Sequence, residues 1–460
     1  MAATGHALKA AVLLASAVLI TPCRAALDSA AFDAEQRRIL EQVEQIESRD
    51  GPYSPALLEE LKKLIVLYRE NDSPSFALVT IERALQIVRA NSGLSSLEQV
   101  PLLWQRIESE EALDNHAEAW EAEQELLALV RRYPDDVQVV PVLRRVADRQ
   151  MRVLGQLVAE GEIPPQVFYG CYYDKYRPSG TECRGSGSRA TVLQGVLADA
   201  GRNYADAIAV LLRNEAYSSD ELRELEMQVV RSVELMRDKP LAPPWLFAST
   251  LEPWRSRIAP IEELATWRLP SEPAGTPEAD YLDRREPREE RFRMPYNRGR
   301  QSLRRLYSYE VAGSSTAASR AAAIVAIADW DLLFSKNALA IEGYALAQSL
   351  LDEDGAGAAP SAELFAPAVP VMLPSFEPNP LAPDETRAAT GYIDVTFSIT
   401  KYGLVRDIKV RDAANADPAD RAELMSLLRI RRFRPRSIDG RFTDSPVAVR
   451  YYVYDRRGAT

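Results

Sequence analysis

The sequence predicts a mainly α protein, a body of repeated helix pairs, followed by a small α+β domain in which three antiparallel strands pack on one helix in the order ββαβ. Two observations predict this fold class. Up to about residue 350, apolar residues recur at three- and four-residue steps, which is the pattern of amphipathic helices. After that, the pattern changes to alternation of apolar and polar residues, which is typical of half-buried strands.

Residues 1–25 are expected to form a secretory signal peptide. Lys9 precedes an apolar run at 10–20 that is too short to span a bilayer, and small residues up to Ala25 provide a cleavage site. The alternative is an uncleaved anchor in the inner membrane, although Pro22 interrupts the run. Lipidation at Cys23 is a further alternative, although the residues before Cys23 match a lipobox poorly. The expected location is the periplasm.

Charge and histidine content exclude several function classes. Loss of the signal removes Lys9, Arg24 and no acidic residue, so the formal net charge of −11 becomes −13, which argues against nucleic acid as the partner. Only His6 and His116 are present, and His6 leaves with the signal. A zinc site with two histidines is therefore excluded in the mature monomer, and His116, in a predicted interhelical turn, is expected to have a surface or packing role.

Two cysteines are left after removal of the signal, Cys171 and Cys183. An even pair in an oxidising compartment favours a disulfide, which would stabilise the fold by about 3 kcal/mol. A metal or redox pair is the alternative, but the pair lacks CxxC spacing and a nearby histidine.

The helical region extends from 26 to 352. Helices are predicted at 28–48, from Leu57 to Tyr68, across 77–88, around 102–113, at 137–160 and 189–238, and again from about Arg298. The stretch 240–300 holds ten prolines and a dense Arg/Glu mixture, which indicates a long irregular connection with short helices.

One spacing of residues recurs in this region. A small residue is followed four positions later by a large one, and a further core residue follows three positions after that. Its three copies are Ala77, Ile81 and Ala84; Ala119, Glu123 and Leu126; and Ala340, Tyr344 and Ala347, the last preceded by Trp330. The first two copies are 42 residues apart. Small residues let paired helices approach closely. The pattern resembles the tetratricopeptide repeat, with Glu123 replacing the usual aromatic; a plain antiparallel helix pair would give the same local fold.

A proline-rich linker is predicted at 353–388. It contains seven prolines, which favour an extended polyproline conformation over helix and sheet. Fully extended at about 3.1 Å per residue, the proline-containing part 355–385 could reach about 95 Å. It is expected to act as a spacer, or as a strap along a domain surface.

The last domain, 389–460, begins with a predicted hairpin. Ile393, Val395, Phe397 and Ile399 alternate with polar residues, and Gly403 is expected to take a positive φ in the turn. Asp417 and Pro418 are typical of the start of a helix, which carries Leu424 and Leu428 on its apolar face. Val447, Val449, Tyr451 and Val453 then form the third strand.

Order and motifs together resemble the C-terminal domain of the TonB family. The residues that carry the resemblance are Gly391, Val395, Phe397, Ile399, Gly403, Val405, Val410, Arg432, Phe433, Pro435, Gly440 and Pro446. The resemblance covers about 75 of the 460 residues. It implies a binding module whose free edge strand pairs with an extended peptide of an outer-membrane receptor, in support of transport across the membrane. The edge it implies here is 447–455, with Val447, Val449, Tyr451 and Val453 as partner-binding residues; a covered or self-paired edge is the alternative.

These features predict a non-enzymatic periplasmic scaffold, with protein-binding repeats and a TonB-like docking domain. The expected partners are envelope proteins or extended peptides, with an outer-membrane receptor among them. No catalytic motif, cofactor or metal ligand set is expected. The alternative is an atypical TonB-type energy transducer held by an uncleaved N-terminal anchor; the sequence lacks that family's long Pro-Glu/Pro-Lys rod.

Overall fold

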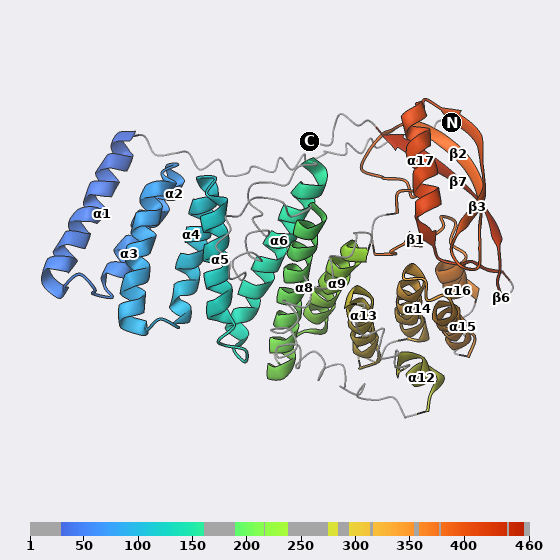
Figure 1. The fold of residues 1–460 in the computed structure, drawn as a ribbon, viewed down its shortest axis with the longest axis horizontal. Coiled ribbons are helices and arrows are strands. Elements are labelled where there is room, and N and C mark those ends of the chain that lie inside the picture. The colour runs from blue at the N-terminus through green and yellow to red at the C-terminus, as the bar shows by residue number, and fades with distance from the viewer. Residues whose placement is uncertain are drawn as a thin grey trace, which may run out of the picture. The chain divides into compact units, whose positions relative to one another are not determined.

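The computed structural model describes residues 29–160, 189–215, 217–237, 275–283, 294–312, 316–353, 358–376, 379–438 and 441–454. The predicted signal peptide, Cys171, Cys183 and most of the stretch 240–300 lie outside these residues. The chain divides into two compact units, Met1–Arg132 and Tyr133–Thr460. The described part is mostly helical with a small C-terminal antiparallel sheet, as the sequence predicts (Figure 1).

The described helices of the first unit pack side by side in chain order (Figure 1). They are α1 (Ser29–Asp50), α2 (Leu57–Glu70), α3 (Pro74–Ser92), α4 (Val100–Ala112) and α5 (His116–Val130). Helix α2 packs on α3 and α4 packs on α5, while α3 and α4 join the two pairs. Each pair buries the apolar stripe that its sequence period predicts, and burial of these stripes is the main stabilising contribution to the unit.

Three helix pairs are joined by the same three-residue turn. Its central residue has a positive φ, 52° at Asp72, 57° at Asp114 and 64° at Ser335. The following residue in each turn donates its backbone N–H to the carbonyl five residues earlier, at 2.9, 2.9 and 2.8 Å. Such an ending satisfies carbonyl groups that the last helical turn leaves free. The same backbone solution therefore recurs in both units.

The repeat residues lie in the helix cores. Ala77, Ala119 and Ala340 each donate their N–H to the carbonyl of the last turn residue, so they occupy equivalent positions. All of the repeat residues are at most 2% exposed: Ala77, Ile81, Ala84, Ala119, Leu126, Trp330, Ala340, Tyr344 and Ala347. Glu123, at the position that Ile81 and Tyr344 hold in the other copies, is also fully buried.

The second unit continues the helical packing. Its described helices are α6 (Val140–Glu160), α8 (Arg189–Asn214), α9 (Ser219–Arg237), α12 (Pro277–Asp283), α13 (Met294–Ala312), α14 (Ala317–Leu333), α15 (Asn337–Glu353) and α16 (Ala358–Phe365). Helices α6, α8, α9, α13, α14 and α15 contact one another in that order, and α12 packs on α15. Helix α13 begins at Met294, earlier than the predicted Arg298, because Pro295 is tolerated in a first helical turn.

The C-terminal domain has the predicted ββαβ order. Its sheet consists of β2 (Ala389–Ile399), β3 (Val405–Ala414) and β7 (Ser445–Tyr454) in the order β3-β2-β7, with both pairs antiparallel. Helix α17 (Pro418–Ile430) covers one face, where Leu424 and Leu428 pack on the buried side chains of β2. Gly403 takes a φ of 72° in the turn, as the sequence predicts.

The segment predicted as an extended linker is partly regular structure. Residues 358–365 form α16, which accommodates Pro360 because a proline in the first turn breaks no helical hydrogen bond. Strand β1 (Met372–Leu373) pairs with β4 (Arg432–Phe433). Leu381 is 1% exposed in the core of the sheet domain. Residues 369–376 and 379–381 are therefore a strap built into that domain, and the extended spacer is not observed in them.

Alternate arginines attach the C-terminal domain to the helices of the second unit. Arg434 forms a two-point ion pair with Asp329 of α14, at 3.0 and 2.5 Å, with only 11% and 4% of the two side chains exposed. Arg432 donates to the carbonyl of Leu332 at the end of α14, at 2.9 Å. Arg436 donates to the carbonyl of Pro367, after α16, at 3.0 Å. The domain is thus fixed to α14 and to the segment after α16.

Candidate partner-binding surface

The sheet of the C-terminal domain has two edges, β3 and β7. In the described part of the chain, each of these strands pairs only with the central strand β2. An edge strand presents a row of backbone N–H and C=O groups that can pair with a further strand. The two edges differ in how well they are suited to such pairing.

Strand β3 is a poor template for a further strand. Asp407 has a φ of 53°, and the pairing with β2 shifts register twice along the strand. Charged residues crowd it at Arg406, Asp407, Lys409 and Arg411. Irregular geometry and charge are the features by which natural sheets prevent edge-to-edge association.

Strand β7 has the opposite properties. Its pairing with β2 runs without a shift from Gly391–Val453 to Ile399–Ser445. It is ten residues long and rich in valine and tyrosine, which favour extended structure, and Arg450 is its only charged residue. Because it is regular and weakly charged, this edge is the better template for an added strand.

The four β7 side chains predicted to contact a partner point mainly to the domain's own core. Val447 is 6% exposed, and Val449 and Tyr451 pack against the core cluster of the sheet. Val453 is half-buried opposite Gly391. These side chains hold the strand in place, so a partner on this edge would be recognised chiefly through the backbone of β7.

The sheet face away from α17 carries a polar network. Arg450 pairs with Asp394 at 2.7 and 2.8 Å and lies 4.0 Å above the Tyr392 ring. Tyr392 in turn donates to Asp412 at 3.0 Å. The hydrogen bonds from Arg450 hold the pKa of Asp394 below its ordinary value, and they raise the pKa of Arg450. Because the charge of Arg450 is already neutralised, β7 offers a partner a nearly neutral edge.

The contacts that orient this edge are made by three arginines that were not among the predicted site residues. Arg432, Arg434 and Arg436 stand at alternate positions, and all three reach the helical part of the second unit. Alternation along an extended segment places such residues on one side, which is the signal that could have indicated a shared contact. Their acceptors lie about 70 to 100 residues earlier in the chain, and no local pattern points to them.

Other site types find no support in the described residues. No group of three or more His, Cys, Asp or Glu side chains there is arranged to hold a metal ion. His116 lies at the start of α5, with its Nε2 3.7 Å from Asp114. Among the described helices, none has both the length and the apolar character needed to span a membrane.

The comparisons with known proteins add no family assignment. The chain matches no protein-family model. It also has no significant match among curated proteins.

Proposed function

We propose that this protein is a non-enzymatic adaptor of the bacterial cell envelope, whose C-terminal domain binds an extended segment of a partner protein as an additional strand on β7. The difference between the two sheet edges carries the proposal: β7 is regular and nearly neutral, whereas β3 is irregular and charged. The likeness to the TonB C-terminal domain supports the same edge and suggests a partner in the envelope, such as an outer-membrane receptor.

The helical region suits the role of a scaffold. Its helices pack in pairs, as they do in repeat proteins, which commonly bind other proteins. The arginine contacts with α14 and the segment after α16 would hold the strand-binding edge at a fixed position on the second unit. The export signal predicted at 1–25 supports a periplasmic location for this adaptor.

The proposal can be tested by site-specific photocrosslinking in intact envelopes. A photoreactive residue replaces Ala448 on β7 or, as the matched control, Val410 on β3; both positions are exposed and lie mid-strand. The expected result is a crosslink from position 448 to an extended segment of one envelope protein and none from position 410.

The captured segment is then synthesised and added to the full chain. Amide hydrogen exchange of β7 is expected to slow at least tenfold, with β3 unchanged, because an added strand protects only the edge it pairs with. Ala448→Lys is expected to weaken binding at least tenfold and Val410→Lys to leave it unchanged. Slower amide exchange confined to β3, or an equal loss of binding affinity in the two variants, would refute the role of β7.

A further inference from the structure

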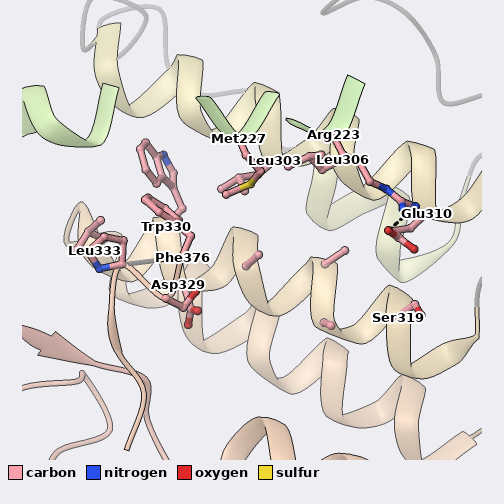
Figure 2. Close-up of a pocket in the computed structure, with 15 residues that line it drawn as sticks. Arg223, Met227, Leu303, Leu306, Glu310, Ser319, Asp329, Trp330, Leu333 and Phe376 are labelled. Atoms are coloured by element: carbon pink, nitrogen blue, oxygen red, sulfur yellow. Dashed lines mark ion pairs between the residues drawn. The ribbon is translucent and has the colours of Figure 1, made fainter. Parts of the chain in front are cut away.

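The second unit contains an apolar cavity that is separate from the β7 edge. It has a volume of about 460 Å³ and lies among α9, α13, α14 and residues 374–376 of the strap (Figure 2). This volume is within the range of pockets that bind small molecules in proteins, roughly 300–1,000 Å³. Most of its wall is hydrocarbon, with Met227, Leu303, Leu306, Leu333 and Phe376 among the lining residues.

The small side chains of α14 create the space. Ala322, Ala323 and Ala326 line the cavity, and α14 is otherwise well packed against α13 and α15. A larger residue at Ala326 would project into the cavity without disturbing the fully buried side of the helix, because Ala326 is only partly buried.

At the end of the cavity formed by Asp329 and Trp330, the polar side chains already have protein partners. Asp329 is bound by Arg434 and accepts from the Tyr344 hydroxyl at 2.8 Å. The Trp330 indole N–H donates to a backbone carbonyl at 2.9 Å. If a ligand placed its own polar groups beside Asp329 and Trp330, those groups would be left unpaired in an apolar environment, at a substantial cost in free energy. The cavity therefore favours a hydrocarbon.

The polarity of the cavity changes along its length. Figure 2 shows Trp330, Leu333 and Phe376 at one end and the Arg223–Glu310 ion pair at the other. Arg223 and Glu310 are 2.7 Å apart, and their side chains are 37% and 26% exposed, so this end is in contact with solvent. A molecule with a hydrocarbon chain and one polar head matches this gradient.

We propose that this cavity binds a single-chain amphiphile, with its aliphatic chain among Leu303, Ala326 and Trp330 and its polar head at the Arg223–Glu310 end. An extended peptide fits the wall poorly, because its backbone N–H and C=O groups would find no partners there. An aliphatic chain needs none, and apolar cavities in proteins readily accept such ligands. This site is independent of the strand edge on β7.

The test uses the full chain and cis-parinaric acid, a fluorescent fatty acid. Ala326→Leu fills the cavity with a residue that favours helix, and Ala345→Leu on α15 is the matched control, since Ala345 is exposed and does not line the cavity. We expect saturable binding by the wild type and the control, and at least tenfold weaker binding by Ala326→Leu. Circular dichroism and thermal unfolding verify that both variants are folded.

Two competitors distinguish the possible sources of the bound aliphatic chain. Displacement of the probe by hexadecanoic acid alone indicates a free fatty acid, and displacement by a lysophospholipid as well indicates that lipid headgroups are accepted; either supports the proposal. Absence of saturable binding by the wild type, or equal affinity of the wild type and Ala326→Leu, overturns it. So does displacement only by an amphipathic helical peptide, which would indicate a groove for a partner helix.

Discussion

Asp329 and Asp331 are two residues apart on α14, and both are buried, yet they have different tasks. Asp331 receives hydrogen bonds from Tyr281, Tyr296 and Arg300, at 2.9, 2.6 and 2.9 Å, and so connects α12, α13 and α14. Asp329 instead pairs with Arg434 of the C-terminal domain. A buried carboxylate is tolerated only when it is fully paired, so each contact makes one arrangement of its neighbours strongly preferred.

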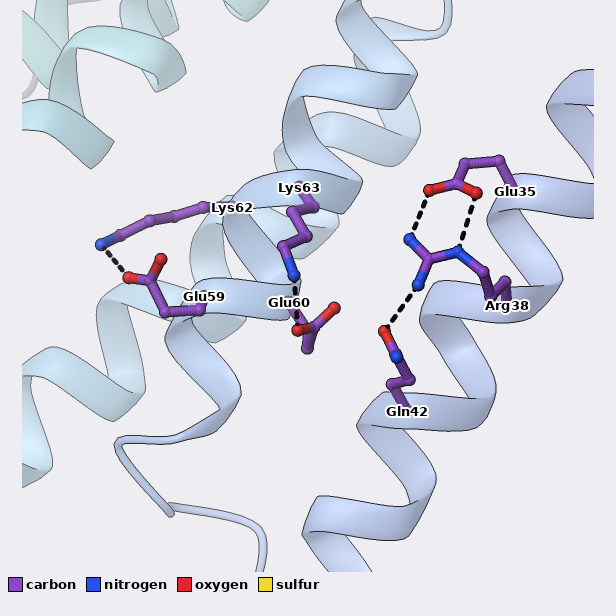
Figure 3. Close-up of polar contacts among 7 residues, drawn as sticks. All are labelled: Glu35, Arg38, Gln42, Glu59, Glu60, Lys62 and Lys63. Atoms are coloured by element: carbon purple, nitrogen blue, oxygen red, sulfur yellow. Dashed lines mark hydrogen bonds and ion pairs between the residues drawn. The ribbon is translucent and has the colours of Figure 1, made fainter.

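The ion pairs on the surface of the first unit differ from these buried ones. Figure 3 shows Arg38 with Glu35, and Lys62 and Lys63 with Glu59 and Glu60, each pair within one helix. Exposed pairs at this spacing contribute little to stability, because solvent screens the two charges. The conformation of α1 and α2 therefore depends on their apolar stripes, while the docking of the C-terminal domain depends on charge.

Loss of Arg434 should be costly. Arg434→Ala leaves the Asp329 carboxylate buried without its cation, and we expect a loss of roughly 3–5 kcal/mol in the free energy of unfolding. Arg429→Ala, an exposed arginine on α17, should change it by less than about 0.5 kcal/mol. Urea denaturation followed by circular dichroism measures both. A similar small loss in the two variants would show that the buried pair is not needed for docking.

The Tyr344 hydroxyl should make stability depend on alkaline pH. Burial, together with the charge of Asp329, raises its pKa well above the ordinary value of 10. Tyr344 ionises near pH 10 in the unfolded chain and only at higher pH in the folded protein. Its contribution to the free energy of unfolding is therefore complete below about pH 10 and is lost as the pH rises further. Between about pH 9 and 11 the wild type should lose more stability than Tyr344→Phe. Equal slopes in the two proteins would contradict the assignment.

At the scale of elements, the C-terminal domain was the most predictable part. The alternation in β2, the positive φ of Gly403 and the start of α17 at Asp417-Pro418 were all predicted, because each depends on residues close in sequence. Gly403 also has a role that the sequence did not indicate. A Cβ there would lie 2.3 Å from the Phe433 carbonyl oxygen, so the turn must pass close to β4.

The start of α17 provides a test at this scale. Asp417 accepts from the N–H of Asp420 at 2.8 Å, and Asp420 accepts from the N–H of Asp417 at 2.9 Å, which is a complete capping box. Asp417→Ala should destabilise the protein by about 1 kcal/mol, within a range of roughly 0.5–2. Ser426→Ala, on the exposed face of the same helix, should be neutral or slightly stabilising. Thermal unfolding measures the stability of the wild type and the two variants. A larger loss of stability in Ser426→Ala than in Asp417→Ala would contradict the capping role.

At the scale of the whole chain, contacts between residues far apart in sequence limited how much of the fold could be predicted. Proline density predicted an extended linker where residues 358–365 form α16, and it could not show that β1 would pair with β4, about 60 residues later. Nor could it show that Arg434 would bind Asp329, about 105 residues earlier. These contacts depend on which surfaces meet, and the alternation of the arginines indicates a shared contact without indicating its partner. The cavity among α9, α13 and α14 is likewise formed by residues that are individually ordinary core or helix-surface side chains.

Two buried residues ahead of β2 indicate where the C-terminal domain begins. Met372 and Leu381 precede β2, yet they are 4% and 1% exposed within the core that β2 and α17 form. If the strap is part of the domain, Leu381→Ala creates a cavity in that core and should cost about 2–5 kcal/mol. Leu404→Ala, in the turn after β2 and 43% exposed, should cost less than about 1 kcal/mol. Both are measured in the full chain by urea denaturation, with Trp fluorescence for the helices and exchange of the β2 amides for the sheet. A strap that merely lies along the surface would give equal small losses, and the domain would then begin at β2.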